Sequence, residues 1–142
     1  MPSVNFFEED ICFNLKNKLK VKEWVKATIA AEGYKLQELN YIFCSDSYLL
    51  NINQQYLDHD TYTDIITFDN SEKERVIEGD IFISIDRIRE NAEKFATGEI
   101  NELHRVIIHG ALHLLGYTDK TAESKELMTA KEDQYLGIRN FT

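Results

Sequence analysis

The segment from residue 103 to residue 119 constrains the fold more than any other part of the chain. Its apolar residues recur three and four positions apart, which predicts a helix over about 99–115 with one strongly buried face. The residues that make this pattern are Leu103, Val106, Ile107, Ala111 and Leu114. A helix this apolar is stable only when it packs against other elements, so we expect the chain to build its core around it.

The rest of the sequence predicts a mixture of strands and helices with few interruptions. Runs rich in β-branched and aromatic residues predict strands over 3–7, 39–44, 65–68 and 79–85. Apolar spacing and capping residues predict helices over about 20–32, from 45–47 to 57, from Asp86 to Gly98, and over about 122–136. Glycines at positions 33, 98 and 137 are placed to end three of these helices. The expected fold class is α+β, a single domain over residues 1–142 with a roughly four-stranded mixed sheet and about five helices.

Length and composition favour one domain and exclude several classes of protein. The 142 residues leave room for one substantial core, and no apolar run approaches the roughly 20 residues that span a bilayer. No secretory signal is visible, and Cys12 and Cys44 have no closely spaced partners, so we expect reduced thiols and a cytoplasmic location. Lys and Arg number 16 against 25 Asp and Glu, and the resulting net charge of −9 argues against a general nucleic-acid binder.

Two histidines on the apolar helix predict a metal site. His109 and His113 are four residues apart, so their Cβ atoms lie roughly 5–6 Å apart on one face and the rings can converge on one ion. Gly116 follows where a left-handed residue would end the helix, and Asp119 then falls where a third ligand can approach. Two histidines, a carboxylate and an open fourth position are typical of a catalytic Zn²⁺ site, with one ion per chain. His104 lies on another side of the helix and is expected to be an ordinary surface histidine.

Other interpretations of these residues stay open. Histidines four apart on an apolar helix also occur as hydrogen-bonded residues that bind no metal. Peptidases with an HExxH helix carry Glu directly after the first histidine, where it activates the bound water. Here that position is Gly110, so a peptidase would lack its central catalytic residue. Asp64 can supply a second carboxylate for catalysis, or it can cap a turn or orient a ligand histidine.

Three blocks of the sequence resemble one known family. The run HGALHLLGY over residues 109–117 resembles the HGxLHLxGY signature of the YbeY-type rRNA maturation endoribonucleases. Residues 53–68 are similar to that family's N..Y...D..TDVLSF block, and residues 79–84 are similar to its GDI.IS strand. The blocks keep the family's order and spacing, and the resemblance covers nearly the whole chain.

The resemblance implies a single α+β domain with a zinc site that acts as a metal-dependent, single-strand-specific endoribonuclease. The implied role is ribosomal RNA processing, notably maturation of the 3′ end of small-subunit rRNA, together with ribosome quality control. Its implied partners are ribosomal RNA and the small ribosomal subunit or its associated proteins, and neither a membrane nor DNA is expected. His109, His113 and Asp119 would bind the metal, and His109, His113 and Asp64 would be the catalytic residues.

The sequence departs from the family pattern at two positions. The family has a third histidine ten residues after the first, where this chain has Asp119, and a carboxylate there makes the site less positive and should acidify bound water less. The family also has an Arg directly after the aromatic residue of its second block, where this chain has Leu57. A planar cation suited to phosphate is therefore missing, and His59, Arg105 and Lys120 are candidates to replace it.

Two charged stretches are interpreted as solvated surface. Five lysines cluster near the first predicted helix: Lys16, Lys18, Lys20, Lys22 and Lys26. They can form an RNA-binding patch, but a solvated helix face is the preferred interpretation. In the last helix the acidic residues Glu123, Glu126, Glu132 and Asp133 are expected to face solvent. Leu127, Met128 and Tyr135 are expected to pack that helix on the core.

Two other functions remain possible on the sequence alone. A metal-dependent hydrolase of peptides or small substrates is supported only by the HxxxH spacing. A non-catalytic, metal-binding ribosome assembly factor is favoured by the loss of the family Arg at Leu57. The acidic composition further predicts weak, salt-sensitive binding to free RNA, with delivery to the substrate through the ribosome or a protein partner.

Overall fold

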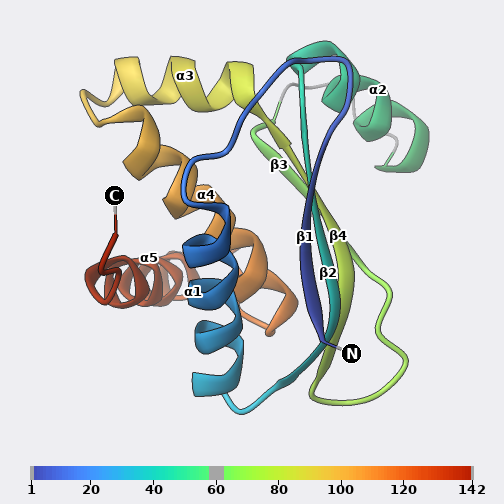
Figure 1. Cartoon of the computed structure of the whole chain (residues 1–142), viewed down its shortest axis with the longest axis vertical. Helices are drawn as coiled ribbons and strands as arrows, with labels where there is room; N and C mark the ends of the chain where they lie inside the picture. The colour runs from blue at the N-terminus through green and yellow to red at the C-terminus, as the bar shows by residue number, and fades with distance from the viewer. Residues whose placement is uncertain (1, 58–62, 142) are drawn as a thin grey trace.

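A mixed four-stranded sheet forms the centre of the molecule (Figure 1). The computed structural model describes residues 2–57 and 63–141, and these form four strands and five helices. In chain order they are β1 (Ser3–Glu8), α1 (Lys18–Ala31), β2 (Lys35–Cys44), α2 (Asp46–Leu57), β3 (Ile65–Asp69), β4 (Val76–Ser84), α3 (Ile85–Lys94), α4 (Glu99–Leu114) and α5 (Ala122–Gly137). The predicted α+β class, with a four-stranded mixed sheet and five helices, is confirmed.

The strand order is β1-β2-β4-β3, so β3 is an edge strand. β2 pairs in parallel with both β1 and β4, whereas β3 runs antiparallel to β4. β2 begins at Lys35, four residues earlier than the predicted 39–44, because pairing with β4 extends it through a polar stretch that its own pattern does not mark. The other strands match the predicted segments to within three residues at each end.

Helices cover both faces of the sheet. Figure 1 shows α1, α4 and α5 on one side and α2 on the other. The larger core lies under α1 and α4, where Ile29, Tyr41 and Ile107 are almost fully buried. The Tyr41 hydroxyl donates a hydrogen bond of 2.8 Å to the Ile107 carbonyl, which attaches α4 to β2, one of the two central strands. A smaller cluster that includes Leu49 and Ile66 packs α2 against the opposite face.

Two predicted helix ends are wrong. The side chain of Ser84, and not that of Asp86, caps α3, since its hydroxyl accepts a hydrogen bond from the Arg87 N–H. The Asp86 carboxylate instead accepts from the Asp46 N–H and so connects α3 to α2. Gly98 does not end α3, which stops at Lys94; it is the N-cap residue of α4.

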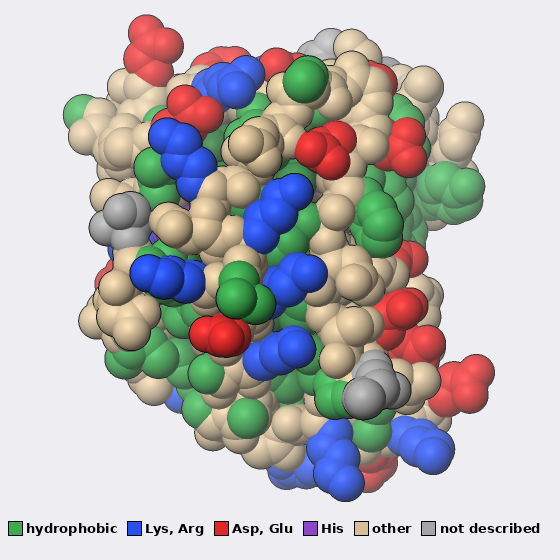
Figure 2. Space-filling view, in the orientation of Figure 1, with side chains coloured by type: hydrophobic (Ala, Val, Ile, Leu, Met, Phe, Trp, Pro, Cys, Tyr) green, Lys and Arg blue, Asp and Glu red, His purple; other side chains and the backbone are tan. Residues whose placement is uncertain are grey.

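The lysines near α1 lie on the outside of the molecule. Lys18, Lys20 and Lys26 are exposed, and the Lys22 ammonium lies 5.9 Å from the centre of the Phe6 ring. Figure 2 shows Lys and Arg side chains gathered over this face. Among the described residues, no helix is both long enough and apolar enough to cross a bilayer.

Candidate active site

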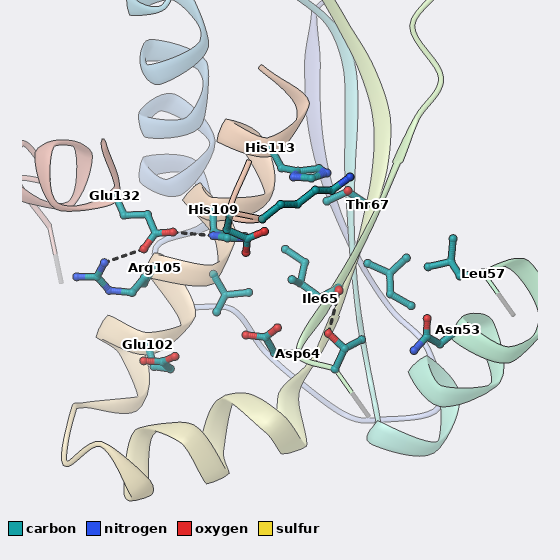
Figure 3. A pocket seen from close by; sticks show the side chains of 15 residues that line it. Asn53, Leu57, Asp64, Ile65, Thr67, Glu102, Arg105, His109, His113 and Glu132 are labelled. Carbon is teal, nitrogen blue, oxygen red and sulfur yellow. Dashed lines mark hydrogen bonds and ion pairs between the residues drawn. The ribbon is translucent and has the colours of Figure 1, made fainter. Parts of the chain in front are cut away.

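α4 presents the two predicted histidines at one pocket. The helix begins after Gly98 and ends before Gly116, whose φ of 103° gives the left-handed turn that the sequence predicts. His109 is partly buried, with 23% of its side chain exposed, whereas His113 is exposed. The pocket has a volume of about 770 Å³ and is bounded by α4, β3, the end of α2, α5 and the turn after α4 (Figure 3).

All four predicted site residues line this pocket: Asp64, His109, His113 and Asp119. Asp64 precedes β3, and its carbonyl accepts a hydrogen bond from the Ser84 N–H, which holds it beside β4. Asp119 reaches the pocket because the chain reverses at Gly116. Residues from three separate segments therefore meet at one place.

The His109 ring contacts a carboxylate through each of its two nitrogens. Nδ1 lies 2.6 Å from Glu132 Oε2, and Nε2 lies 3.7 Å from Asp119 Oδ2. Burial of the ring favours its neutral form, but the hydrogen bond with Glu132 and the nearby negative charges outweigh burial and raise the pKa of His109. The Nε2 atom is thus directed toward the acidic side of the pocket.

Acidic side chains crowd the same pocket. Burial raises the pKa of the Asp64 carboxyl, and the charges of Asp119 and Glu132 add to this effect while His109 opposes it. Burial also raises the pKa of Glu102, with a further contribution from Asp64. At both Asp64 and Glu102 the charges of other carboxylates add to the effect of burial, and a bound cation would offset those charges.

The donor set fits a zinc ion in its chemistry. Imidazole nitrogens and a carboxylate are ordinary zinc ligands, and two ligands of one tetrahedral ion lie about 3.3 Å apart. The distance of 3.7 Å between His109 Nε2 and Asp119 Oδ2 is close to that spacing. No group of three or more His, Cys, Asp or Glu side chains within residues 2–57 and 63–141 is gathered tightly enough to hold a metal ion, so the ligand set stays a prediction.

Glu132 is a buried site residue, and the sequence predicts it wrongly as a surface residue. It was expected to face solvent, but its side chain is only 8% exposed and it contacts both His109 and Arg105. Arg105 Nη1 lies 2.8 Å from Glu132 Oε1, and Arg105 Nη2 lies 2.6 Å from Asp133 Oδ1. One signal was present: Glu132 stands four residues after Met128, which is predicted to pack and is buried.

Two other predictions about side-chain exposure are wrong. His104, expected on the surface, is 2% exposed and packs against the rings of Trp24 and Phe141. Arg139 donates a hydrogen bond to its Nδ1, and burial, together with the Arg139 charge, lowers the pKa of His104 to about 4. Leu127, expected to pack, is 51% exposed. His104 is buried because neighbouring residues cover α4 on a second side, which the main apolar stripe of this helix does not indicate.

The candidates for a phosphate-binding cation differ in whether they already form ion pairs. Arg105 lines the pocket but is held by Glu132 and Asp133. Lys120 also lines the pocket, is exposed, and forms no ion pair with any residue in the described part of the chain. His59 lies outside the described residues. Leu57, at the position of the family Arg, borders the pocket at the end of α2.

Gly110 faces the sheet and not the pocket. A Cβ atom at this position would lie 2.9 Å from Ile65 Cδ1 and 3.0 Å from both Ile81 Cδ1 and Ile81 Cγ2. These distances are shorter than normal carbon–carbon contacts, so α4 approaches the sheet this closely because position 110 has no side chain. A glutamate here, as in an HExxH peptidase, would point into the core.

Comparison with known proteins gives a consistent result. The family model described as Endoribonuclease YbeY matches residues 4–139. A protein of Cytophaga hutchinsonii named Endoribonuclease YbeY is 53% identical over 139 residues, which is 98% of this chain and 97% of that protein. One of the same name from Flavobacterium psychrophilum is 49% identical over 132 residues, covering 93% of this chain and 94% of its own. A solution structure of a Thermotoga maritima protein superposes with a TM-score of 0.64 at 28% identity, over 95% of this chain and 90% of that one.

Proposed function

The chain belongs to the YbeY endoribonuclease family, and from this membership we propose that it is a zinc-dependent, single-strand-specific endoribonuclease that processes ribosomal RNA. The proposed role includes maturation of the 3′ end of small-subunit rRNA and ribosome quality control, carried out in the cytoplasm. The observation that supports it most is the meeting of His109, His113, Asp119 and Asp64 in one pocket. The proposal assigns this activity to a single domain over residues 1–142.

His109, His113 and Asp119 are the residues that would hold the zinc ion. A bound zinc ion supplies a Lewis acid for a phosphoryl oxygen and lowers the pKa of a bound water. Asp119 takes the place of the family's third histidine, and as an oxygen ligand it makes the site more tolerant of harder metals than three imidazoles would be. The distance of 3.7 Å between His109 Nε2 and Asp119 Oδ2 supports this ligand set.

Two other side chains act on the substrate in this proposal. Asp64 in its ionised form accepts a proton from the water that attacks the phosphorus atom, and its raised pKa makes it a stronger base than an ordinary aspartate. Lys120 binds a non-bridging phosphate oxygen in place of the missing family Arg. A lysine binds phosphate as a point charge without the two-pronged geometry of arginine, so we expect weaker orientation of the scissile group.

The net charge of −9 weakens the electrostatic attraction between this protein and free RNA. None of the pocket residues comes from α1, so the lysines of that helix do not lie at the reaction centre. We therefore expect weak binding to free RNA and delivery through the ribosome or an associated protein. Tight binding to naked RNA at physiological salt would contradict this expectation.

Metal content and RNA cleavage, measured on the same preparations, test the proposal. The purified protein should carry about one zinc per chain by elemental analysis, and His109→Ala should lose both the metal and the cleavage of single-stranded rRNA. Full zinc and full activity in His109→Ala would refute the assigned site. Asp119→His should retain zinc and cleave faster. If only Asp119→His is loaded and active while the natural chain is inert, then Asp119 marks a degenerate site.

A non-catalytic role in ribosome assembly is the second candidate, and Leu57 beside the pocket favours it. Cells in which His109→Ala is the only copy separate the two roles. Normal rRNA ends in such cells would favour the assembly role, and unprocessed ends would favour the nuclease. Assays of the zinc-loaded protein on peptides and on RNA side by side test the peptidase alternative, which Gly110 disfavours.

A further inference from the structure

We propose that Glu132 is a positioning residue that keeps the proton of His109 on Nδ1, so that the Nε2 lone pair faces the pocket. This inference rests on the proposed function, because it concerns how one of the proposed metal ligands is prepared. The pair joins two helices, since His109 belongs to α4 and Glu132 to α5. Figure 3 shows the contact and the Arg105 side chain on the far side of the carboxylate.

The place of Glu132 in the fold calls for an explanation beyond packing. It lies on the buried side of α5, four residues after Met128 and three before Tyr135, which are both 2% exposed. A residue that only packed here would be apolar, because burying a carboxylate is costly unless it is fully paired. Glu132 is paired at both oxygens: Oε1 with Arg105 at 2.8 Å and Oε2 with His109 at 2.6 Å.

The direction of the hydrogen bond follows from the chemistry of the two groups. An ionised carboxylate is only an acceptor, so Nδ1 of His109 must be the donor. Arg105 is paired with the other carboxylate oxygen, Oε1, and so leaves Oε2 to accept from His109. A neutral imidazole has one proton, and when Nδ1 holds it, Nε2 has a lone pair available for a metal.

The second histidine has no such arrangement. His113 is exposed, and no carboxylate in the part of the chain that the structure describes is paired with its ring. His109 is therefore the ligand that is oriented in advance, whereas His113 remains free to adjust. Carboxylates that orient a ligand histidine typically contribute about 10- to 100-fold in metal affinity.

Nitrogen NMR and zinc binding test this role with matched variants. Glu132→Gln keeps the size of the side chain but removes its charge. Asp133→Asn removes the other carboxylate that binds Arg105 and does not touch His109. In the metal-free wild type, at a pH above the His109 transition, the ring should carry its proton on Nδ1. Glu132→Gln should show a larger share of the Nε2–H form, whereas Asp133→Asn should resemble the wild type.

Zinc affinity, measured by competition with a chromophoric chelator, should fall about 10- to 100-fold in Glu132→Gln and less than about twofold in Asp133→Asn. A wild-type His109 with its proton on Nε2, or a Glu132→Gln variant that binds zinc as tightly as Asp133→Asn, would overturn the inference. If Glu132→Gln does not fold, the wild-type spectrum alone decides. A wild type that binds no zinc would refute the proposed metal site, while the metal-free spectra would still decide the role of Glu132.

Discussion

The glycine after the first site histidine offers a direct test of how tightly α4 lies on the sheet. We compare Gly110→Ala with Gly137→Ala, because both residues are in helices and neither has a left-handed backbone. They differ in their surroundings. A Cβ atom at Gly110 meets Ile65 and Ile81 at 2.9–3.0 Å, whereas one at Gly137 meets nothing within 4 Å.

The expected free energies have opposite signs. Replacing glycine by alanine in a helix stabilises it by at most about 1 kcal/mol, and by less at the end of a helix, so Gly137→Ala should gain about 0.5 kcal/mol. At Gly110 the same gain is opposed by overpacking, which typically costs about 1–3 kcal/mol when the neighbours must shift. The crowding atoms at Gly110 are ends of isoleucine side chains, which can move. A net loss of about 1 kcal/mol in Gly110→Ala is therefore expected.

Urea unfolding of the two variants beside the wild type measures this difference. The urea midpoint should fall for Gly110→Ala and rise slightly for Gly137→Ala, and a change of about 1 kcal/mol corresponds to about 0.3–1 M urea at slopes of about 1–3 kcal/mol/M. Equal stabilisation by both substitutions would refute the close approach of α4 to the sheet. The expected result would explain the absence of a glutamate after the first histidine as a packing requirement.

Three further predictions concern pH and RNA. The folded state lowers the pKa of His104 to about 4 from 6.5, so protonation of this ring favours unfolding. As the pH is lowered from 6.5 to about 4, the free energy of unfolding should fall by up to about 3 kcal/mol. His104→Gln should remove that part of the pH dependence in unfolding titrations, and an unchanged slope would contradict the burial of the ring. Burial opposes ionisation of Glu32, but hydrogen bonds from Tyr117, Tyr135 and Lys131 lower its pKa below 4.5. The contribution of the Glu32 carboxylate to folding stability should therefore be present above pH 4.5 and be lost as the pH falls below it. Glu32→Gln should lack this acid-induced loss of stability. Lys120→Ala should weaken binding of single-stranded RNA and reduce the slope of log affinity against log salt by about 0.7, whereas Lys125→Ala on the outside of α5 should not.

Most of the fold was predictable because its elements carry strong local patterns. The spacing of Leu103, Val106 and Ile107 is sufficient to place α4, and β-branched residues mark β4. The errors lie where partners decide the outcome. The first residues of β2 are polar and join the sheet through pairing with β4, and the start of α3 is decided by which of two neighbouring polar side chains reaches the Arg87 N–H.

The site was predictable in its local part and not in its tertiary part. His109, His113 and Gly116 follow from helical spacing and a left-handed turn, and the two histidines do lie at one pocket with Asp119. Glu132 is 23 residues from His109 in the chain, so only the docking of α5 on α4 brings the two together. The spacing of Glu132 from Met128 indicates the buried side of α5, but no local pattern indicates that Glu132 meets a histidine of another helix.

The position of Glu132 on α5 gives the site an order of assembly. A chain is synthesised from its N-terminus, so α4 with both histidines is made before α5. A partly made chain therefore has the two imidazoles without the carboxylate that orients one of them. For a protein whose proposed substrate is part of the machinery that synthesises it, the proposed orientation of His109 then forms only after α5 has docked on α4.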